Sequence, residues 1–95
     1  MIHGKGIKIG KYTYYKSDHI NKKLMTTVDN KIIHFGDAAY EQYKDKTGIW
    51  TTLDHNNESR RRSYLKRSKG IKDKDGNITW KDPRSANYHA IRVLW

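Results

Sequence analysis

Two runs of β-forming residues separated by only two residues most tightly constrain how this chain can fold. Residues 23–28 and 31–35 are rich in β-branched and apolar side chains, and Asp29-Asn30 lies between them. Aspartate and asparagine tolerate the positive φ angles that two-residue hairpin turns require. We therefore expect the two runs to form a tight antiparallel hairpin.

A third β-forming run precedes this hairpin at residues 11–15, and residues 17–21 link the two. Three consecutive runs joined in this way predict a three-stranded antiparallel meander. Glycines are frequent before the first run, which indicates a flexible lead-in over residues 1–10. The remaining residues, 11–95, are short enough to form a single compact domain.

The second half of the chain carries helix signals. Asn56-Asn57-Glu58 predicts a helix start, and this helix is expected to continue to Lys69. Asp82-Pro83 offers a cap and a first-turn proline for a second helix that extends to the end of the chain. Residues 37–43 can form a short helix or an ordered loop. The predicted fold class is α+β, with two main helices packed on the N-terminal meander.

The core of such a domain must be built largely from aromatic side chains. Only 35% of the residues are hydrophobic and the net charge is +10, a balance that usually favours disorder. Three Trp, seven Tyr and one Phe argue for a folded chain, because each aromatic side chain buries a large area. The absence of cysteine excludes disulfides and thiolate metal sites, so packing alone must hold the fold together.

The positive charge is concentrated in segments. Residues 59–81 contain nine basic residues against two acidic ones, and residues 1–35 contain seven against two. Between them, residues 36–58 contain five acidic residues against two basic ones. Because the acidic segment can absorb only part of the surplus, much of the positive charge should face solvent or a polyanion.

A helical wheel separates the basic residues of the first helix. Tyr64, Leu65 and Ser68 share one face, and Arg61 lies among them. A guanidinium on an inner face needs a partner, so we predict that Arg61 forms a structural ion pair with the acidic segment. The favoured partner is Asp37, and the other candidates are Glu41 and Asp54.

The remaining basic side chains of this helix and the following loop favour nucleic-acid binding. Dense positive charge gains affinity by releasing the counterions condensed on phosphates. No base-reading motif occurs in the sequence, so we expect binding that tolerates any sequence. The predicted nucleic-acid-binding residues are Arg60, Arg62, Lys66, Arg67, Lys69 and Lys72.

Two other groups of residues have alternative interpretations. Tyr12, Tyr14 and Tyr15 can stack on single-stranded bases if they lie on an open sheet face, or Tyr12 and Tyr14 can face the core. The C-terminal helix is apolar around most of its circumference, which leaves His89 and Arg92 as its polar strip.

The histidines do not suggest a metal or catalytic site. They lack the short paired spacing of helical zinc sites, so we predict no metal and no cofactor. Residues 54–57 have a weak likeness to the His and Asn of metal-dependent nucleases, but arginines occupy the region where that motif needs another ligand. We therefore predict no catalytic residues and no enzymatic activity. The five histidines are His3, His19, His34, His55 and His89.

Most of the chain from about residue 11 resembles a family of small uncharacterised proteins encoded by large double-stranded DNA viruses and some tailed phages. The resemblance implies a viral origin and a compact domain, and it assigns no activity. It rests on Tyr14-Tyr15-Lys16-Ser17-Asp18, His34-Phe35-Gly36-Asp37, Tyr40-Glu41, Tyr43-Lys44-Asp45-Lys46-Thr47-Gly48, Arg61-Arg62, Tyr64-Leu65, Arg67, Asp82-Pro83, Ser85-Ala86-Asn87-Tyr88 and Leu94-Trp95.

Two functions follow as expectations. The first is a small virus-encoded protein that binds DNA or RNA and is carried within the virion. The second is a capsid-associated or cement protein that acts through contacts with other virion proteins. We expect the protein in the virion or the infected-cell cytoplasm, and no membrane association, because every apolar stretch is short.

Overall fold

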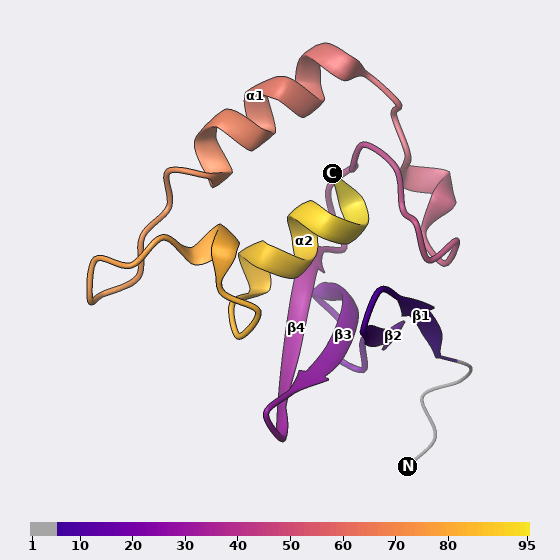
Figure 1. The fold of residues 1–95 in the computed structure, drawn as a ribbon. Helices are drawn as coiled ribbons and strands as arrows, with labels where there is room; N and C mark the ends of the chain where they lie inside the picture. The colour runs from indigo at the N-terminus through magenta and orange to yellow at the C-terminus, as the bar shows by residue number, and fades with distance from the viewer. Residues whose placement is uncertain (1–5) are drawn as a thin grey trace.

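The computed structural model describes residues 6–95 and confirms the α+β class, with a four-stranded antiparallel sheet followed by two helices packed on it (Figure 1). The strands lie in chain order across the sheet. Within this described part of the chain, no helix has the length and apolar character needed to cross a membrane. The elements are β1 (Ile7–Ile9), β2 (Tyr12–Lys16), β3 (Lys22–Val28), β4 (Lys31–Asp37), the 3₁₀ helix η1 (Thr51–Leu53), α1 (Glu58–Ser68), the 3₁₀ helix η2 (Thr79–Lys81) and α2 (Ala86–Leu94).

The predicted hairpin is confirmed as the connection between β3 and β4. Val28 pairs with Lys31, so only two residues form the turn. Asp29 and Asn30 have φ angles of 51° and 65°, the left-handed conformation required at both central positions of a type I′ turn.

The sheet has one strand more than the sequence predicted. β1 pairs with β2 through a two-residue connection in which Gly10 has a φ of 64°. This glycine forms a tight turn, whereas we expected it to be part of a flexible lead-in. Ile9 packs against the core, which explains why so short a strand is held in place. Residues 1–5 of the predicted lead-in lie outside the described residues.

The core lies between α2 and the sheet. Gly36 in β4 has a φ of 78°, and a Cβ atom at this position would lie 2.8 Å from Leu94 Cδ1. The missing side chain therefore lets α2 lie close against β4. Ile9, Tyr12, Ile49, Trp50 and Trp95 pack around a buried centre of Tyr14, Leu24, Phe35, Ala90, Val93 and Leu94.

The second helix begins later than predicted, at Ala86. Its cap is Ser85, whose hydroxyl accepts a hydrogen bond from the backbone N–H of Asn87 (3.2 Å). Asp82 instead uses its carboxylate to accept the backbone N–H of Arg84 (3.0 Å). Asp82-Pro83 thus forms a turn before the helix, because the Asp82 side chain bonds to the backbone two residues further on.

The segment between the sheet and α1 completes the end of α2. Of residues 37–43, Asp37 ends β4 and the rest form turns and an isolated bridge, so the ordered loop is the alternative that is observed. The backbone N–H groups of Lys44 and Lys46 donate to the carbonyls of Leu94 and Val93 at 3.1 and 3.0 Å. Carbonyls in the last turn of a helix have no partner within the helix, so this segment satisfies them.

Candidate nucleic-acid interface

The basic helix α1 forms for local reasons. Asn57 precedes it and accepts a hydrogen bond from the backbone N–H of Arg60 at 3.1 Å. Glu58 lies in the first turn, while Lys66 and Arg67 lie in the last turn. These charges match the helix dipole at both ends. The predicted start of the helix is confirmed, and its observed end is one residue before the predicted one.

One side of α1 contacts the rest of the protein. Arg61, Tyr64 and Leu65 are half-buried, and Ser68 is buried, whereas their helical neighbours are exposed. The Tyr64 ring stacks on Trp95, with ring centroids 3.9 Å apart and planes inclined by 5°. The predicted inner face is therefore confirmed, and it orients the rest of the helix.

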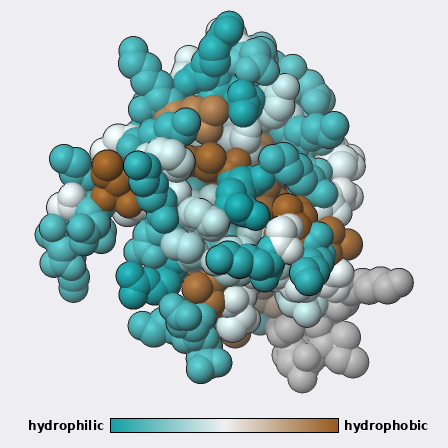
Figure 2. Space-filling model, viewed as in Figure 1, coloured by the Kyte–Doolittle hydropathy of each residue, from teal (hydrophilic) through white to brown (hydrophobic). Residues whose placement is uncertain are grey.

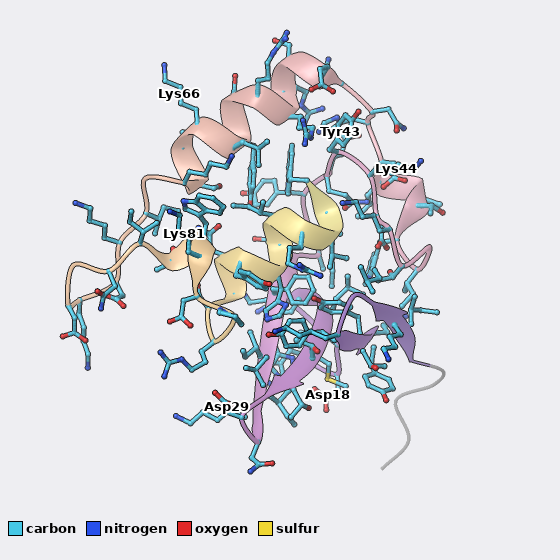
Figure 3. All side chains as sticks on the ribbon, viewed as in Figure 1. Asp18, Asp29, Tyr43, Lys44, Lys66 and Lys81 are labelled. Carbon is cyan, nitrogen blue, oxygen red and sulfur yellow. The ribbon has the colours of Figure 1, made fainter. Side chains whose placement is uncertain are left out.

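A second side of α1 points into solvent and carries Arg62, Lys66 and Lys69. All three are exposed, and Lys66 extends away from the body of the protein (Figure 3). None of them forms an ion pair with any residue between 6 and 95. Lys69 Nζ lies 4.9 Å from the Trp80 ring centroid, and Lys72 is exposed in the loop that follows. Hydrophilic side chains cover this end of the molecule in Figure 2.

The third side of α1 borders a cleft of about 710 Å³ between α1, β4 and α2. Arg60 and Arg67 lie along it. Arg60 Nη1 lies 2.9 Å from Glu41 Oε1, and hydrogen bonding to this guanidinium lowers the pKa of Glu41. Both side chains are half-exposed, so the pair contributes little to stability. Among the predicted binding residues, Arg60 is thus already engaged by a carboxylate.

The predicted ion pair between Arg61 and Asp37 does not form. Arg61 Nη1 pairs with Glu58 at 3.1 Å, and its Nε donates to the Trp95 carbonyl at 2.7 Å. The same guanidinium lies 5.3 Å from the centroid of the Tyr43 ring. Asp37, at the end of β4, accepts the backbone N–H two residues further on at 2.9 Å. Arg61 thus makes structural contacts, but its ion pair is with Glu58 in the first turn of α1 instead of Asp37, and its Nε–H ties α1 to the end of the chain.

The tyrosines of β2 do not form an open stacking surface. Tyr14 is fully buried, and Tyr12 packs edge-on against Tyr88 with centroids 6.2 Å apart. Their alternative interpretation as core residues is therefore confirmed. Tyr15 is half-buried on the other face of the sheet.

The expectation that His89 lies on a polar strip was wrong. Its ring is fully buried, with Nδ1 2.8 Å from the Tyr14 hydroxyl and Nε2 2.6 Å from the Pro83 carbonyl. Because a carbonyl only accepts, Nε2 carries the proton and Tyr14 donates to Nδ1. Burial lowers the pKa of His89. A helical wheel could not predict this, since both partners lie outside α2.

The structure also brings together three potential metal ligands that looked scattered in the sequence. One ligand atom from each of Asp18, His19 and His34 lies within 4.8 Å of the other two. His34 pairs with Met25 in the sheet, and residues 17–21 connect β2 to β3. The predicted hairpin register and this short link were the sequence signals that could have placed the three side chains together.

No curated protein and no solved structure matches the chain. A family model does match residues 12–68, which run from the first residue of β2 to the last residue of α1. This segment is more than half of the 95 residues and includes three strands and the basic helix. The chain therefore belongs to the family of unknown function DUF5754.

Proposed function

We propose that this protein is a small, non-enzymatic, virus-encoded domain that binds DNA or RNA without strong sequence preference. The observation that carries the proposal is the solvent-facing side of α1, where exposed cations form no ion pair with the described residues around them. We call this side, with the loop behind it, the outer basic surface. It consists of Arg62, Lys66, Lys69 and Lys72.

The spacing of this surface suits a phosphate backbone. Lys69 is the C-cap of α1, seven residues after Arg62, and this separation corresponds to about 10 Å along the helix axis. One strand of a duplex carries a charge about every 3.4 Å of axis, so this length spans roughly three phosphates. Each neutralised phosphate releases condensed counterions, and this gain does not depend on the base sequence.

The composition of the outer basic surface favours contacts with the phosphate backbone of a nucleic acid over recognition of its bases. Its side chains are exposed Lys and Arg of α1 and of the residues that follow it, and Arg67 extends the charge toward the cleft. Phosphate contacts of this kind carry no sequence information. The viral origin, and a role with the packaged genome in the virion, are inferred from the sequence motifs that resemble viral proteins.

Reversing the charge of the outer basic surface tests the proposal. We expect Arg62→Glu/Lys66→Glu/Lys69→Glu to lose binding to random duplex and single-stranded DNA, measured by gel shift at two salt concentrations. Circular dichroism melting should show at most a modest decrease in melting temperature. These side chains make no ion pair with residues 6–95, and the change removes only the Lys69–Trp80 contact and the favourable charge of Lys66 in the last turn of α1.

A matched control carries the same change in net charge elsewhere on the protein. Lys8→Glu/Lys31→Glu/Lys44→Glu reverses three exposed lysines that lie outside α1. This control should retain most of the binding. A second variant, Arg62→Gln/Lys66→Gln/Lys69→Gln, removes the three charges without reversing them. The slope of the logarithm of the binding constant against the logarithm of salt concentration should be steeper for wild type than for this variant by about three, one for each lost phosphate contact. Equal loss in the two Glu variants would show that only net charge matters and would refute a specific role of α1.

A capsid-associated structural protein is the second candidate, and exposed apolar side chains favour it. Ile20 is 93% exposed, and four further large hydrophobic residues lie on the surface. Such side chains suit contacts with other virion proteins. A contact with an apolar centre should survive high salt, whereas phosphate binding should weaken steeply with salt. The four residues are Ile32, Tyr40, Ile71 and Ile78.

A further inference from the structure

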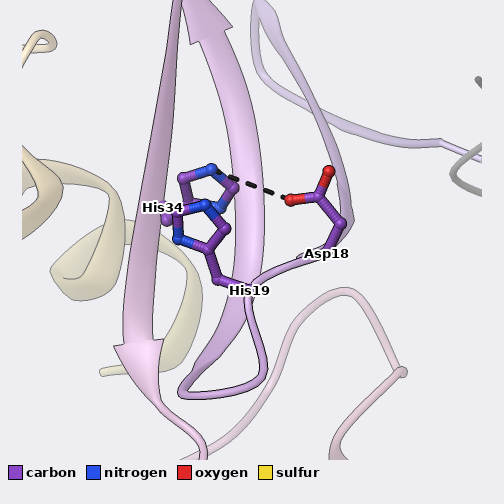
Figure 4. A group of neighbouring side chains, drawn as sticks. All are labelled: Asp18, His19 and His34. Carbon is purple, nitrogen blue, oxygen red and sulfur yellow. Dashed lines mark ion pairs between the residues drawn. The ribbon is translucent and has the colours of Figure 1, made fainter.

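Three side chains with metal-ligating atoms meet beside the sheet, far from α1. Asp18 and His19 lie in the connection between β2 and β3, and His34 lies in β4 (Figure 4). Their ligand atoms all lie within 4.8 Å of one another, and His34 Nε2 is 3.9 Å from Asp18 Oδ1. We call these residues the Asp18–His19–His34 cluster.

We propose that the Asp18–His19–His34 cluster binds one divalent ion of the zinc class and leaves at least one coordination position open to solvent. Zinc binds histidine nitrogen and carboxylate oxygen at about 2.1 Å, so two ligands in a tetrahedral site are about 3.4 Å apart. The observed 3.9 Å between His34 and Asp18 needs to shorten by only about 0.5 Å.

The second ring nitrogen of His34 is already held in place. His34 Nδ1 lies 2.7 Å from Ser17 Oγ, and the same oxygen accepts the backbone N–H of His19 at 3.0 Å. Histidines that bind metals almost always donate their other N–H to an oxygen of this kind. When Nδ1 donates to Ser17, the Nε2 lone pair faces Asp18 and is free for a metal.

Solvent can reach the Asp18–His19–His34 cluster. The side chain of His34 is 17% exposed and that of Asp18 is 49% exposed, so an ion can enter from solvent.

One adjustment accompanies binding. The rings of His19 and His34 stack with centroids 3.7 Å apart and planes inclined by 11°, so their lone pairs run side by side instead of converging. His19 is exposed, and the terminal torsion of a histidine ring rotates broadly. Binding therefore turns the His19 ring out of this stack toward the ion, which is a change that can be observed.

The ligand set determines the class of ion. Two imidazoles and one carboxylate suit zinc and its first-row neighbours, whereas calcium and magnesium prefer oxygen ligands alone. Three protein ligands leave the fourth position to water or to a small ligand. The ion would fasten the β2–β3 connection onto β4, so it should stabilise the folded state.

Zinc titration of the full chain tests the proposal. Isothermal titration calorimetry should give one site per chain, with no comparable heat from magnesium, and zinc should raise the melting temperature. Asp18→Ala and His19→Ala change exposed residues, so both variants should fold and each should bind zinc at least 10-fold more weakly. Ser17→Ala should weaken binding by about 10–100-fold, as expected for a residue that orients a ligand.

Matched controls separate this site from other histidines and from the proposed nucleic-acid interface. His55→Ala removes a histidine outside the cluster, and it should leave zinc affinity within about 3-fold of wild type. The Arg62→Glu/Lys66→Glu/Lys69→Glu variant should bind zinc normally, because Lys66 and Asp18 lie at opposite ends of the molecule (Figure 3). The two proposals can therefore fail separately.

Spectroscopy gives a second readout. Proton–nitrogen NMR spectra should show zinc-dependent shifts of the His19 and His34 rings, and the His19 shift should report the loss of stacking. The proposal is overturned if zinc does not bind stoichiometrically, if Asp18→Ala and His19→Ala bind it less than 10-fold more weakly than wild type, or if the shifts appear at other histidines. In those cases the cluster is only a hydrogen-bonded contact between the connection and β4.

Discussion

Replacing Tyr14 by Phe isolates the hydrogen bond in the centre of the core. Tyr14 and His89 are both fully buried, and the Tyr14 hydroxyl is 2.8 Å from His89 Nδ1. The other ring nitrogen of His89 is occupied by the Pro83 carbonyl at 2.6 Å. Tyr14→Phe keeps the ring that packs on Phe35 and removes the hydroxyl, which donates to His89 and also interacts with Arg92. The variant leaves Nδ1 without a partner and away from water.

A buried acceptor that loses its donor costs about 1–3 kcal/mol of stability. We expect Tyr14→Phe to lower the free energy of unfolding by this amount at neutral pH. Each kcal/mol lowers the melting temperature of a domain of this size by roughly 4–8 °C. The m-value, which is the slope of the free energy of unfolding against urea concentration, should not change, because the surface exposed on unfolding is nearly the same.

Urea denaturation followed by tryptophan fluorescence measures this loss. Tyr40→Phe provides the matched control, since it makes the same chemical change at a side chain that is 68% exposed. The control should differ from wild type by less than about 0.5 kcal/mol. If Tyr14→Phe is as stable as the control, the hydrogen bond does not matter for the fold and the assignment of the His89 proton is wrong.

Other predictions concern pH, capping and the close approach of α2 to the sheet. Burial lowers the pKa of His89, so the unfolded chain takes up a proton first as the pH falls, and burial lowers the pKa of His34 and His55 in the same direction. The free energy of unfolding should therefore decrease as the pH falls below about 6.5, with each of these histidines contributing at most about 1.4 kcal/mol per pH unit, measured by urea titrations from pH 7.5 to 5. Asn57→Ala should cost about 1 kcal/mol and Asn57→Asp should cost little, because only the first loses the cap of α1. Gly36→Ala should cost about 1–3 kcal/mol in the same assay, since the new Cβ meets Leu94 at a positive φ. A chain that lacks Leu94 and Trp95 should show no cooperative melting transition, and a normal transition would contradict their place in the core.

Features set by local chemistry could be predicted from the sequence. The type I′ turn at Asp29-Asn30 depends on two residues and on the runs beside it, and the cap at Asn57 depends on one turn of helix. The inner face of α1 followed from its periodicity. Features that depend on contacts between distant segments could not be predicted. The partners of His89 come from β2 and from the turn before α2, and Arg61 reaches the end of the chain.

The partners of the carboxylates in the acidic segment, residues 36–58, also could not be predicted from the sequence. Asp45 is buried and accepts the backbone N–H groups of Thr47 and Trp50, at 2.8 and 2.6 Å. Asp54 accepts the side-chain amide of Gln42 at 2.6 Å and the backbone N–H of Asp45 at 2.7 Å. These carboxylates are satisfied by neutral donors, so they shape the segment that closes the end of α2.

The basic charge of the second half of the chain therefore remains largely available. Of the nine basic residues between 59 and 81, Arg60 and Arg61 pair with Glu41 and Glu58, and the other seven form no ion pair with a described residue. If the carboxylates of residues 36–58 neutralised α1, then removing the charge of any of these carboxylates would strengthen binding to phosphate. Because Asp45 is held by backbone donors instead, Asp45→Asn should lower stability and leave the salt dependence of the proposed DNA binding unchanged. Glu41→Gln should free Arg60 and make that salt dependence steeper.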